Sequence, residues 1–219
     1  MNIAEVTCPV RHKIVRMVAP RLYETTIQDH QWHPTARAST CFVKMKMPQK
    51  RVSVVEVGVY QGVNAENIIK TLDVDILFAV DPYVPYTERG RDWYSPFFGI
   101  SAETAKLEAA KRLAPFGEKV KFIYETSERA SLTVPDDQGF VYVDGAHGYE
   151  FVRKDIELWY PKLSPDGIIG GHDFSNKYPG VIKAVTEFAV KSDLQLMVDS
   201  GDWWLVNRHR PLWRSSMVN

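Results

Sequence analysis

Hydrophobic residues from Val52 onward fall into short runs that are separated by amphipathic stretches. The runs are rich in β-branched and aromatic residues, which is typical of strands covered on both faces. They span residues 52–58, 75–81, 119–125, 139–145 and 166–173. Stretches with the spacing of amphipathic helices lie between or after them, at 64–72, 101–117, 150–163 and 180–191. Strand and helix therefore alternate along this part of the chain.

This alternation predicts an α/β sandwich around a mostly parallel sheet. Two further strands are expected at 194–199 and 202–208, joined only by the segment Ser-Gly-Asp. Such a short link permits a hairpin but no parallel crossover. We therefore expect a Rossmann-like, seven-stranded sheet with one antiparallel strand near the C-terminus. The pair Asp166 and Gly167 is expected to form the turn that opens the fifth strand.

The first 50 residues show a different pattern. Helical spacing appears at 10–26, where Pro20 interrupts it, and again at 33–48. The sequence thus predicts a helical N-terminal appendage over residues 1–50 and a second domain over residues 51–219.

Composition narrows the functional classes. The 219 residues are 45% hydrophobic, and 27 basic residues balance 27 acidic ones, with a pI near 7.0. A nucleic-acid partner is not expected, because that needs a basic excess. No apolar run approaches the length of a membrane span, and the two cysteines form no disulfide framework, so a cytoplasmic location is expected. The sequence is compatible with a homo-oligomer and does not define one.

The turn after the first predicted strand contains Gly58 and Gly62. Glycine permits a positive φ and a close approach of a ligand to the backbone, and the next helix, with Asn64 as its expected N-cap, offers free N–H groups to a carboxylate. Tyr60 stands where a dinucleotide-binding loop needs glycine, and no phosphate-binding lysine follows Gly62. The ligand is therefore expected to lack a pyrophosphate.

Asp81 ends the second predicted strand. An acid there binds the two hydroxyls of a ribose in many α/β proteins. It can equally cap the turn that begins at Pro82. Together with Glu56 and the glycines, it favours a nucleoside ligand without phosphate.

At this point the sequence resembles a known family. The segments VVEVGVYQGVNAENI, FAVDPY, FIYETSERA and FVYVDGAHGYEFVRKDIELWYPKLSPDGIIGGHDF are similar to class I S-adenosylmethionine-dependent methyltransferases. They are most similar to the small-molecule O-methyltransferase branch that includes macrocin O-methyltransferase and cephalosporin-tailoring relatives. The resemblance covers residues 52–207.

The resemblance implies a role for each matching residue. Glu56 and Gly58 would line the methionine end of S-adenosylmethionine, with Gly62 at the tight turn. Asp81 would bind the ribose, and Thr126 and Ser127 would lie near the adenine. Asp144 would also border the cofactor.

Asp144 and Asp173 each follow an apolar strand, and consecutive strands usually pair, so the two carboxylates should lie close together. Such a pair needs a shared cation or proton. In one interpretation, Asp144, His172 and Asp173 hold a divalent cation such as Mg²⁺ or Mn²⁺, with His147 as an alternative ligand. In another, His147 or His172 is the general base that acts on a substrate hydroxyl. In a third, Asp144 only caps the helix near Tyr149, and His172 fills space beside the cofactor. The relatives carry an acidic pair where this chain has His172 and Asp173.

The segment 82–99 is rich in aromatic residues, proline and glycine, and it begins at the expected ligand end of the sheet. It is either a lid over the acceptor or a self-packed surface loop. Its candidate contacts are Tyr83, Tyr86, Trp93 and Tyr94. The predicted activity is methylation of a small hydroxylated metabolite; the alternatives are an NAD-linked oxidoreductase and a non-catalytic nucleoside-binding module.

Overall fold

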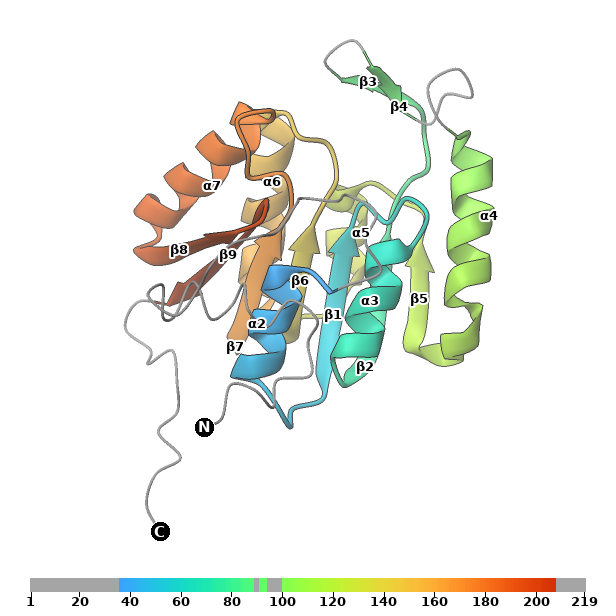
Figure 1. Ribbon diagram of the computed structural model, residues 1–219, viewed down its shortest axis with the longest axis horizontal. Coiled ribbons are helices and arrows are strands. Elements are labelled where there is room, and N and C mark those ends of the chain that lie inside the picture. The colour runs from blue at the N-terminus through green and yellow to red at the C-terminus, as the bar shows by residue number, and fades with distance from the viewer. Residues whose placement is uncertain (1–35, 89–90, 94–99, 208–219) are drawn as a thin grey trace.

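The computed structural model describes residues 36–88, 91–93 and 100–207, and it places a single seven-stranded sheet at the centre (Figure 1). The strands follow one another in space in the order β5-β2-β1-β6-β7-β9-β8. Their bounds are β1 Val52–Val57, β2 Val74–Val80, β5 Val120–Ile123, β6 Gln138–Val143, β7 Leu163–Gly171, β8 Leu194–Asp199 and β9 Asp202–Asn207. Strand β9 runs antiparallel to both of its neighbours, β7 and β8, and the other six strands of this sheet share one direction. The predicted Rossmann-like sheet with one antiparallel strand is confirmed.

Helices cover both faces of the sheet. The first layer holds α2 (Ala38–Lys46), α3 (Val63–Thr71) and α4 (Ala102–Leu113), and the second holds α5 (Ser127–Thr133), α6 (Tyr149–Trp159) and α7 (Pro179–Lys191). Short 3₁₀ turns follow α4 at Ala114–Lys119 and α6 at Tyr160–Lys162. A separate hairpin, β3 (Tyr86–Glu88) with β4 (Arg91–Trp93), extends beyond the carboxyl ends of the strands (Figure 1).

The alternation of side chains along the central strands explains the two layers. In β6, Phe140 and Tyr142 belong to the hydrophobic core under α2 and α3, whereas Val141 and Val143 belong to the core under α6 and α7. Successive residues of a strand point to opposite faces, so a continuous apolar run supplies both cores. The sequence signal for doubly covered strands therefore had a direct structural cause.

Several boundaries differ from the predicted ones. Helix α3 begins at Val63 after Gly62, which has a left-handed conformation, so Asn64 lies in the first turn and is no N-cap. Strand β7 begins at Leu163 and contains Asp166 and Gly167, which lie at an irregularity in its pairing with β6 rather than in a turn. Helix α5 and the β3–β4 hairpin were not predicted.

Helix α2 lies within the range predicted as an appendage, yet it packs onto the sheet beside β7 and β9. The predicted helix at 10–26 lies outside the described residues, so the division into two domains stays a prediction. Cys41 of α2 is buried. The expected cytoplasmic location stays a prediction.

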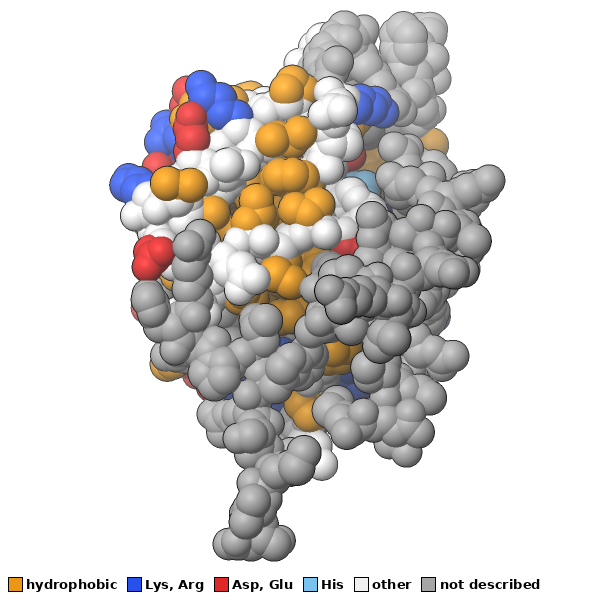
Figure 2. Space-filling view, turned by 60° about the vertical axis from the view of Figure 1, so that its left-hand side comes forward, with side chains coloured by type: hydrophobic (Ala, Val, Ile, Leu, Met, Phe, Trp, Pro, Cys, Tyr) orange, Lys and Arg blue, Asp and Glu red, His pale blue; other side chains and the backbone are white. Residues whose placement is uncertain are grey.

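The edge of the sheet at β8 carries exposed apolar residues. Figure 2 turns the side with α7 and β8 forward and shows hydrophobic side chains gathered there. Val190 of α7 and Val198 of β8 are both exposed. A homo-oligomer stays a prediction. Within the described ranges, no helix has the length and apolar character needed to cross a membrane.

Candidate active site

A cavity of about 460 Å³ opens at the carboxyl ends of β1, β2, β6 and β7. Its volume lies in the range of small-molecule sites, and its position is where open α/β sheets bind ligands. Most of the predicted site residues line it, namely Glu56, Gly58, Asp81, Thr126, Ser127, Asp144, His147, His172 and Asp173. Gly62 is not among the lining residues.

Glu56 is the second-to-last residue of β1 and is almost completely buried. Its Oε1 accepts a hydrogen bond from Asn64 Nδ2 at 2.8 Å, while Oε2 has no hydrogen-bond partner in the described part of the chain. Burial raises the pKa of Glu56 to about 8. A buried carboxyl with an unsatisfied oxygen is a suitable partner for a ligand ammonium group.

The two glycines of the first turn have different structural roles. Both have positive φ, 86° at Gly58 and 74° at Gly62. A Cβ at Gly58 would lie 2.2 Å from the carbonyl oxygen of Asp144, so glycine lets β1 and β6 end side by side. A Cβ at Gly62 would lie 3.2 Å from the Cα of Ala109 in α4. Close ligand approach, as predicted from the sequence, is therefore not what requires glycine at position 62.

Asp81 organises the loops around the cavity. Its Oδ2 accepts hydrogen bonds from the amides of Val59 and Tyr60 at 3.0 and 2.9 Å, and its Oδ1 accepts one from the amide of Tyr83 at 2.8 Å. Tyr60 and Tyr83 both have positive φ. The bond to Tyr83 shows that the turn-capping interpretation was correct, and the position in the cavity is compatible with the ribose role as well.

Thr126 and Ser127 begin helix α5 and reach the cavity beside a buried acid. Ser127 Oγ accepts a hydrogen bond from Trp159 Nε1 at 2.8 Å and also bonds to the carboxyl of Asp155. Burial raises the pKa of Asp155 to about 7. Asp155 lines the cavity but escaped the sequence analysis, because it appeared as one polar position of an amphipathic helix.

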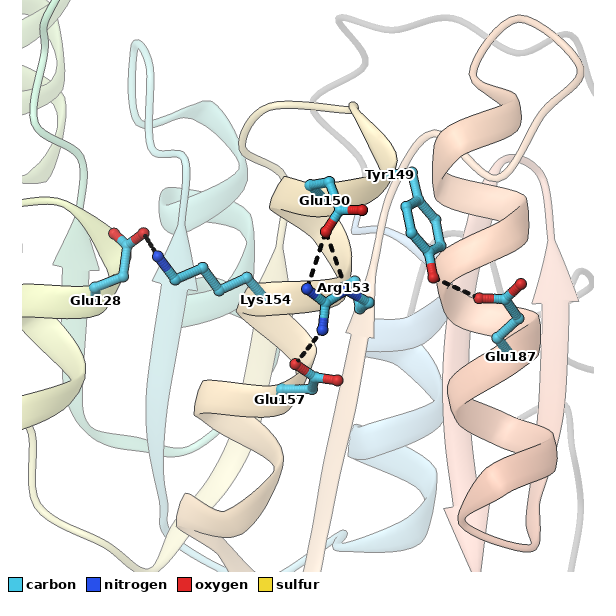
Figure 3. Close-up of polar contacts among 7 residues, drawn as sticks. All are labelled: Glu128, Tyr149, Glu150, Arg153, Lys154, Glu157 and Glu187. Atoms are coloured by element: carbon cyan, nitrogen blue, oxygen red, sulfur yellow. Dashed lines mark hydrogen bonds and ion pairs between the residues drawn. The ribbon is translucent and has the colours of Figure 1, made fainter.

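Helix α6, which carries Asp155, is fixed to its neighbours from the solvent side (Figure 3). Lys154 pairs with Glu128 of α5, and Tyr149 donates a hydrogen bond to Glu187 of α7 at 2.6 Å. Exposed pairs of this kind contribute little individually. Together they link three adjacent helices, α5, α6 and α7.

Asp144, His147 and Asp173 form the polar centre of the cavity. One ligand atom from each lies within 4.8 Å of the others. His147 Nε2 lies 2.7 Å from Asp173 Oδ2, and the imidazole stacks on the ring of Tyr178 with centroids 4.2 Å apart. The strands β6 and β7 pair directly, as predicted, and this pairing brings the two acids together. Helix α6 has Gly148 as its N-cap without a side-chain bond, so the interpretation of Asp144 as a helix cap was wrong.

The electrostatics of the two acids differ. Burial raises the pKa of Asp144, although His172 opposes the rise and Asp173 adds to it. Burial also acts to raise the pKa of Asp173, but hydrogen bonds from His147 and His172 outweigh it and hold that pKa well below its usual range. The cluster thus holds one firmly ionised carboxylate beside a carboxyl that binds a proton more readily.

His172 differs from its expected role as a metal ligand. Its Nδ1 lies 3.4 Å from Asp173 Oδ1, and its Nε2 is buried with no hydrogen-bond partner among the described residues. The three groups that come within ligand distance of one another are Asp144, His147 and Asp173. The structure therefore adds His147 to the two acids as a candidate ligand, while His172 contacts Asp173 beside them.

The segment after Asp81 has a divided role. Tyr83 is buried, and its hydroxyl donates a hydrogen bond to the Tyr60 carbonyl at 2.8 Å, so it fixes the loop rather than contacting an acceptor. Tyr86 lines the cavity. The side chain of Trp93 is not described, and Tyr94 lies outside the described residues.

The sequence match to a family model, together with the fold, assigns the chain to the S-adenosylmethionine-dependent methyltransferases. A family model described as a methyltransferase domain matches residues 55–174, which is more than half of the chain, and the chain belongs to this family. The prediction of a methyltransferase is confirmed and is favoured over the NAD-linked alternative. Comparison with the sequences of curated proteins gives no match.

Solved structures share the fold at low sequence identity. The O-methyltransferase NovP is 18% identical with a TM-score of 0.58, and the match covers 89% of this chain and 96% of NovP. A putative caffeoyl-CoA O-methyltransferase from Staphylococcus aureus is 14% identical with a TM-score of 0.55, covering 90% and 91%. TomG from Streptomyces achromogenes, solved in complex with S-adenosylmethionine, is 14% identical with a TM-score of 0.53, covering 89% and 88%.

Proposed function

We propose that this methyltransferase transfers the methyl group of S-adenosylmethionine to a hydroxyl of a small acceptor. The observation that carries the proposal is the cluster of Asp144, His147 and Asp173 inside a cavity of small-molecule size. O-methylation needs a group that lowers the pKa of the acceptor hydroxyl or removes its proton. The names of the O-methyltransferases with the same fold agree with this chemistry.

The proposed cofactor position follows the polar groups of the cavity. The buried and unsatisfied Oε2 of Glu56 would accept the ammonium of the methionine part. The free N–H groups at the start of α3 would bind its carboxylate. Asp81 would accept a ribose hydroxyl, and Thr126 and Ser127 would border the adenine.

The reaction itself would take place between the sulfonium and the acidic cluster. The S–CH₃ bond breaks as the O–CH₃ bond forms, and the hydroxyl proton leaves the acceptor. Holding the two reactants in line supplies part of the rate. The remaining task is to stabilise the developing alkoxide or to accept its proton, and two arrangements of the same residues would do this.

In the first arrangement a divalent cation binds at the cluster. Two carboxylates and one imidazole fit Mn²⁺ or Fe²⁺, and with water ligands they fit Mg²⁺ less closely. The chain's own contribution would be Asp144, His147 and Asp173 as ligands. In the second arrangement no cation is needed, and His147, oriented by Asp173 at 2.7 Å, accepts the hydroxyl proton.

Two measurements test the proposal. Isothermal titration with S-adenosylhomocysteine should show binding by the folded protein, and its absence would contradict the cofactor assignment. Titration with Mn²⁺ should show one site that is lost in Asp144→Asn and retained in Asp136→Asn, an exposed control.

Methyl transfer from labelled S-adenosylmethionine to a panel of small hydroxylated compounds then separates the two arrangements. A cation-dependent reaction should fall on EDTA treatment and return with Mn²⁺. A His147 base should be insensitive to EDTA, and His147→Ala should lower the rate by ~10²–10⁴-fold. Activity that survives both changes would leave neither arrangement standing.

A further inference from the structure

Arg37 brings a positive charge into the cavity from outside the region matched by the family model. It immediately precedes helix α2, which runs antiparallel to β1 (Figure 1), so the start of α2 lies at the carboxyl edge of the sheet. Arg37 is one of the residues that line the cavity. The sequence analysis placed no functional residue in this segment.

Asp202 of β9 fixes the start of α2. One carboxylate oxygen accepts hydrogen bonds from the amide and the hydroxyl of Ser39 at 3.0 and 2.6 Å. The other oxygen accepts one from the hydroxyl of Tyr142 at 3.0 Å. The carboxylate thereby satisfies the helix terminus. This buried hydrogen-bond network therefore fixes the backbone next to Arg37.

The guanidinium itself has unused hydrogen-bonding capacity. In the described part of the chain, no hydrogen bond or ion pair joins it to another side chain, although it carries five N–H donors. Burial acts to lower the pKa of Arg37, but the acidic groups around it outweigh burial and keep it charged. Arg37 is half-buried and lines the cavity, so its donors are available to an anionic ligand group there.

His172 supplies a second unsatisfied group on the same side of the cavity. Its side chain is 6% exposed, its Nε2 has no hydrogen-bond partner among the described residues, and it also lines the cavity. Arg37 acts electrostatically on it. Because Nδ1 is directed to the Asp173 carboxylate and donates to it, Nε2 is left as a hydrogen-bond acceptor, so His172 borders the subsite without donating to an anion.

From these groups we propose that Arg37 forms a subsite for a carboxylate of the methyl acceptor, so that the acceptor is a hydroxylated carboxylic acid. This inference rests on the proposed function, since it assigns the acceptor side of the same cavity. A guanidinium matches the two oxygens of a carboxylate in a bidentate pair. A phosphate with two charges fits less well, because Asp144 and Asp173 act on the same region.

The cofactor's own carboxylate is the other anion that could reach Arg37. The charged and polar groups that act electrostatically on Arg37 lie on β6 and β9 or directly after β6 and β7. The start of α3, which would bind the cofactor carboxylate, instead follows β1. We therefore assign Arg37 to the acceptor, and cofactor binding provides the test of this choice.

The experiment compares acids with their neutral amides. Isothermal titration of protein loaded with S-adenosylhomocysteine would use 4-hydroxybenzoate, 3,4-dihydroxybenzoate and 3-hydroxybutanoate, each beside its amide. Wild-type protein should bind at least one acid about 10- to 100-fold more tightly than the amide, the range for hydrogen bonds to a charged group. Arg37→Gln should abolish the preference, and Arg37→Lys should retain part of it. Arg153→Gln, on the solvent face of α6, is the matched control and should behave as wild type.

Three outcomes would overturn the inference. The first is the absence of any acid preference in the wild type, and the second is a preference that survives in folded Arg37→Gln. The third is a loss of S-adenosylhomocysteine affinity in Arg37→Gln, which would assign the guanidinium to the cofactor carboxylate. Failure of the wild type to bind S-adenosylhomocysteine would instead contradict the proposed function itself.

Discussion

Replacement of Asp81 by alanine should destabilise the protein and weaken cofactor binding at the same time. The buried carboxylate accepts three hydrogen bonds, from the backbone amides of Val59, Tyr60 and Tyr83, at 2.8–3.0 Å. Hydrogen bonds to a charged group contribute ~1.5–3 kcal/mol each and are not additive when they share one acceptor. We expect the free energy of unfolding to fall by ~3–5 kcal/mol, a large share of the ~5–15 kcal/mol typical of a domain.

The two effects can be measured separately. Urea unfolding without ligand reports the loss of stability, and titration of the folded variant with S-adenosylhomocysteine at low temperature reports affinity. Affinity should fall by ~1.5–3 kcal/mol if Asp81 also holds the ribose. Asp75→Ala is the control, because Asp75 is exposed and pairs with Arg51 at the surface, and such pairs contribute ~0–1 kcal/mol. A stability of Asp81→Ala within 1 kcal/mol of wild type would refute the loop-organising role, by the same scale.

Further predictions concern the buried acids and the first glycine. The folded-state pKa of Glu56 is raised to about 8, so ionisation of this carboxyl opposes folding. The free energy of unfolding should therefore decline as pH rises from the unfolded pKa of 4.5 towards 8. Urea titrations of Glu56→Gln should show a smaller decline. The pKa of Asp155 is likewise raised, to about 7, so its ionisation should lower the free energy of unfolding between about pH 4 and 7. Asp155→Asn should remove this contribution to the pH dependence. An unchanged pH profile in either variant would contradict the assignment. Gly58→Ala should destabilise by more than ~3 kcal/mol because its Cβ meets the Asp144 carbonyl, whereas Gly117→Ala, also at positive φ but in open space, should lose only ~1 kcal/mol; equal losses would show that the contact is relieved.

The sequence predicted those features that depend on local pattern. Continuous apolar runs identified the strands, because both faces of each strand are covered. The short link before Asp202 identified the antiparallel strand, because it leaves no room for a crossover. The approach of Asp144 to Asp173 also followed from the order of strands along the chain.

Features that depend on side-chain geometry could not be predicted in this way. His147 lies with the two acids and stacks on Tyr178, whereas His172 leaves Nε2 without a hydrogen-bond partner among the described residues. Nothing in the spacing of histidines encodes that choice. Arg37 was missed because its segment resembles no family motif, and its role comes from a contact between Ser39 and Asp202 across most of the chain. Helix α5 was missed because seven residues with little apolar periodicity give no helical signal.

The position of β9 between β7 and β8 has a consequence for the order of folding during synthesis. Strands β1, β2, β5 and β6 can pair as soon as residues up to 143 have left the ribosome, but β8 meets the described sheet only through β9. The β8 strand must therefore wait for residues 202–207, which follow it in the chain. Since Asp202 also fixes the start of α2, the half of the cavity that surrounds Arg37 is completed only when these last residues join. The nascent chain would thus form the part of the cavity at β1 and β2 before the part around Arg37.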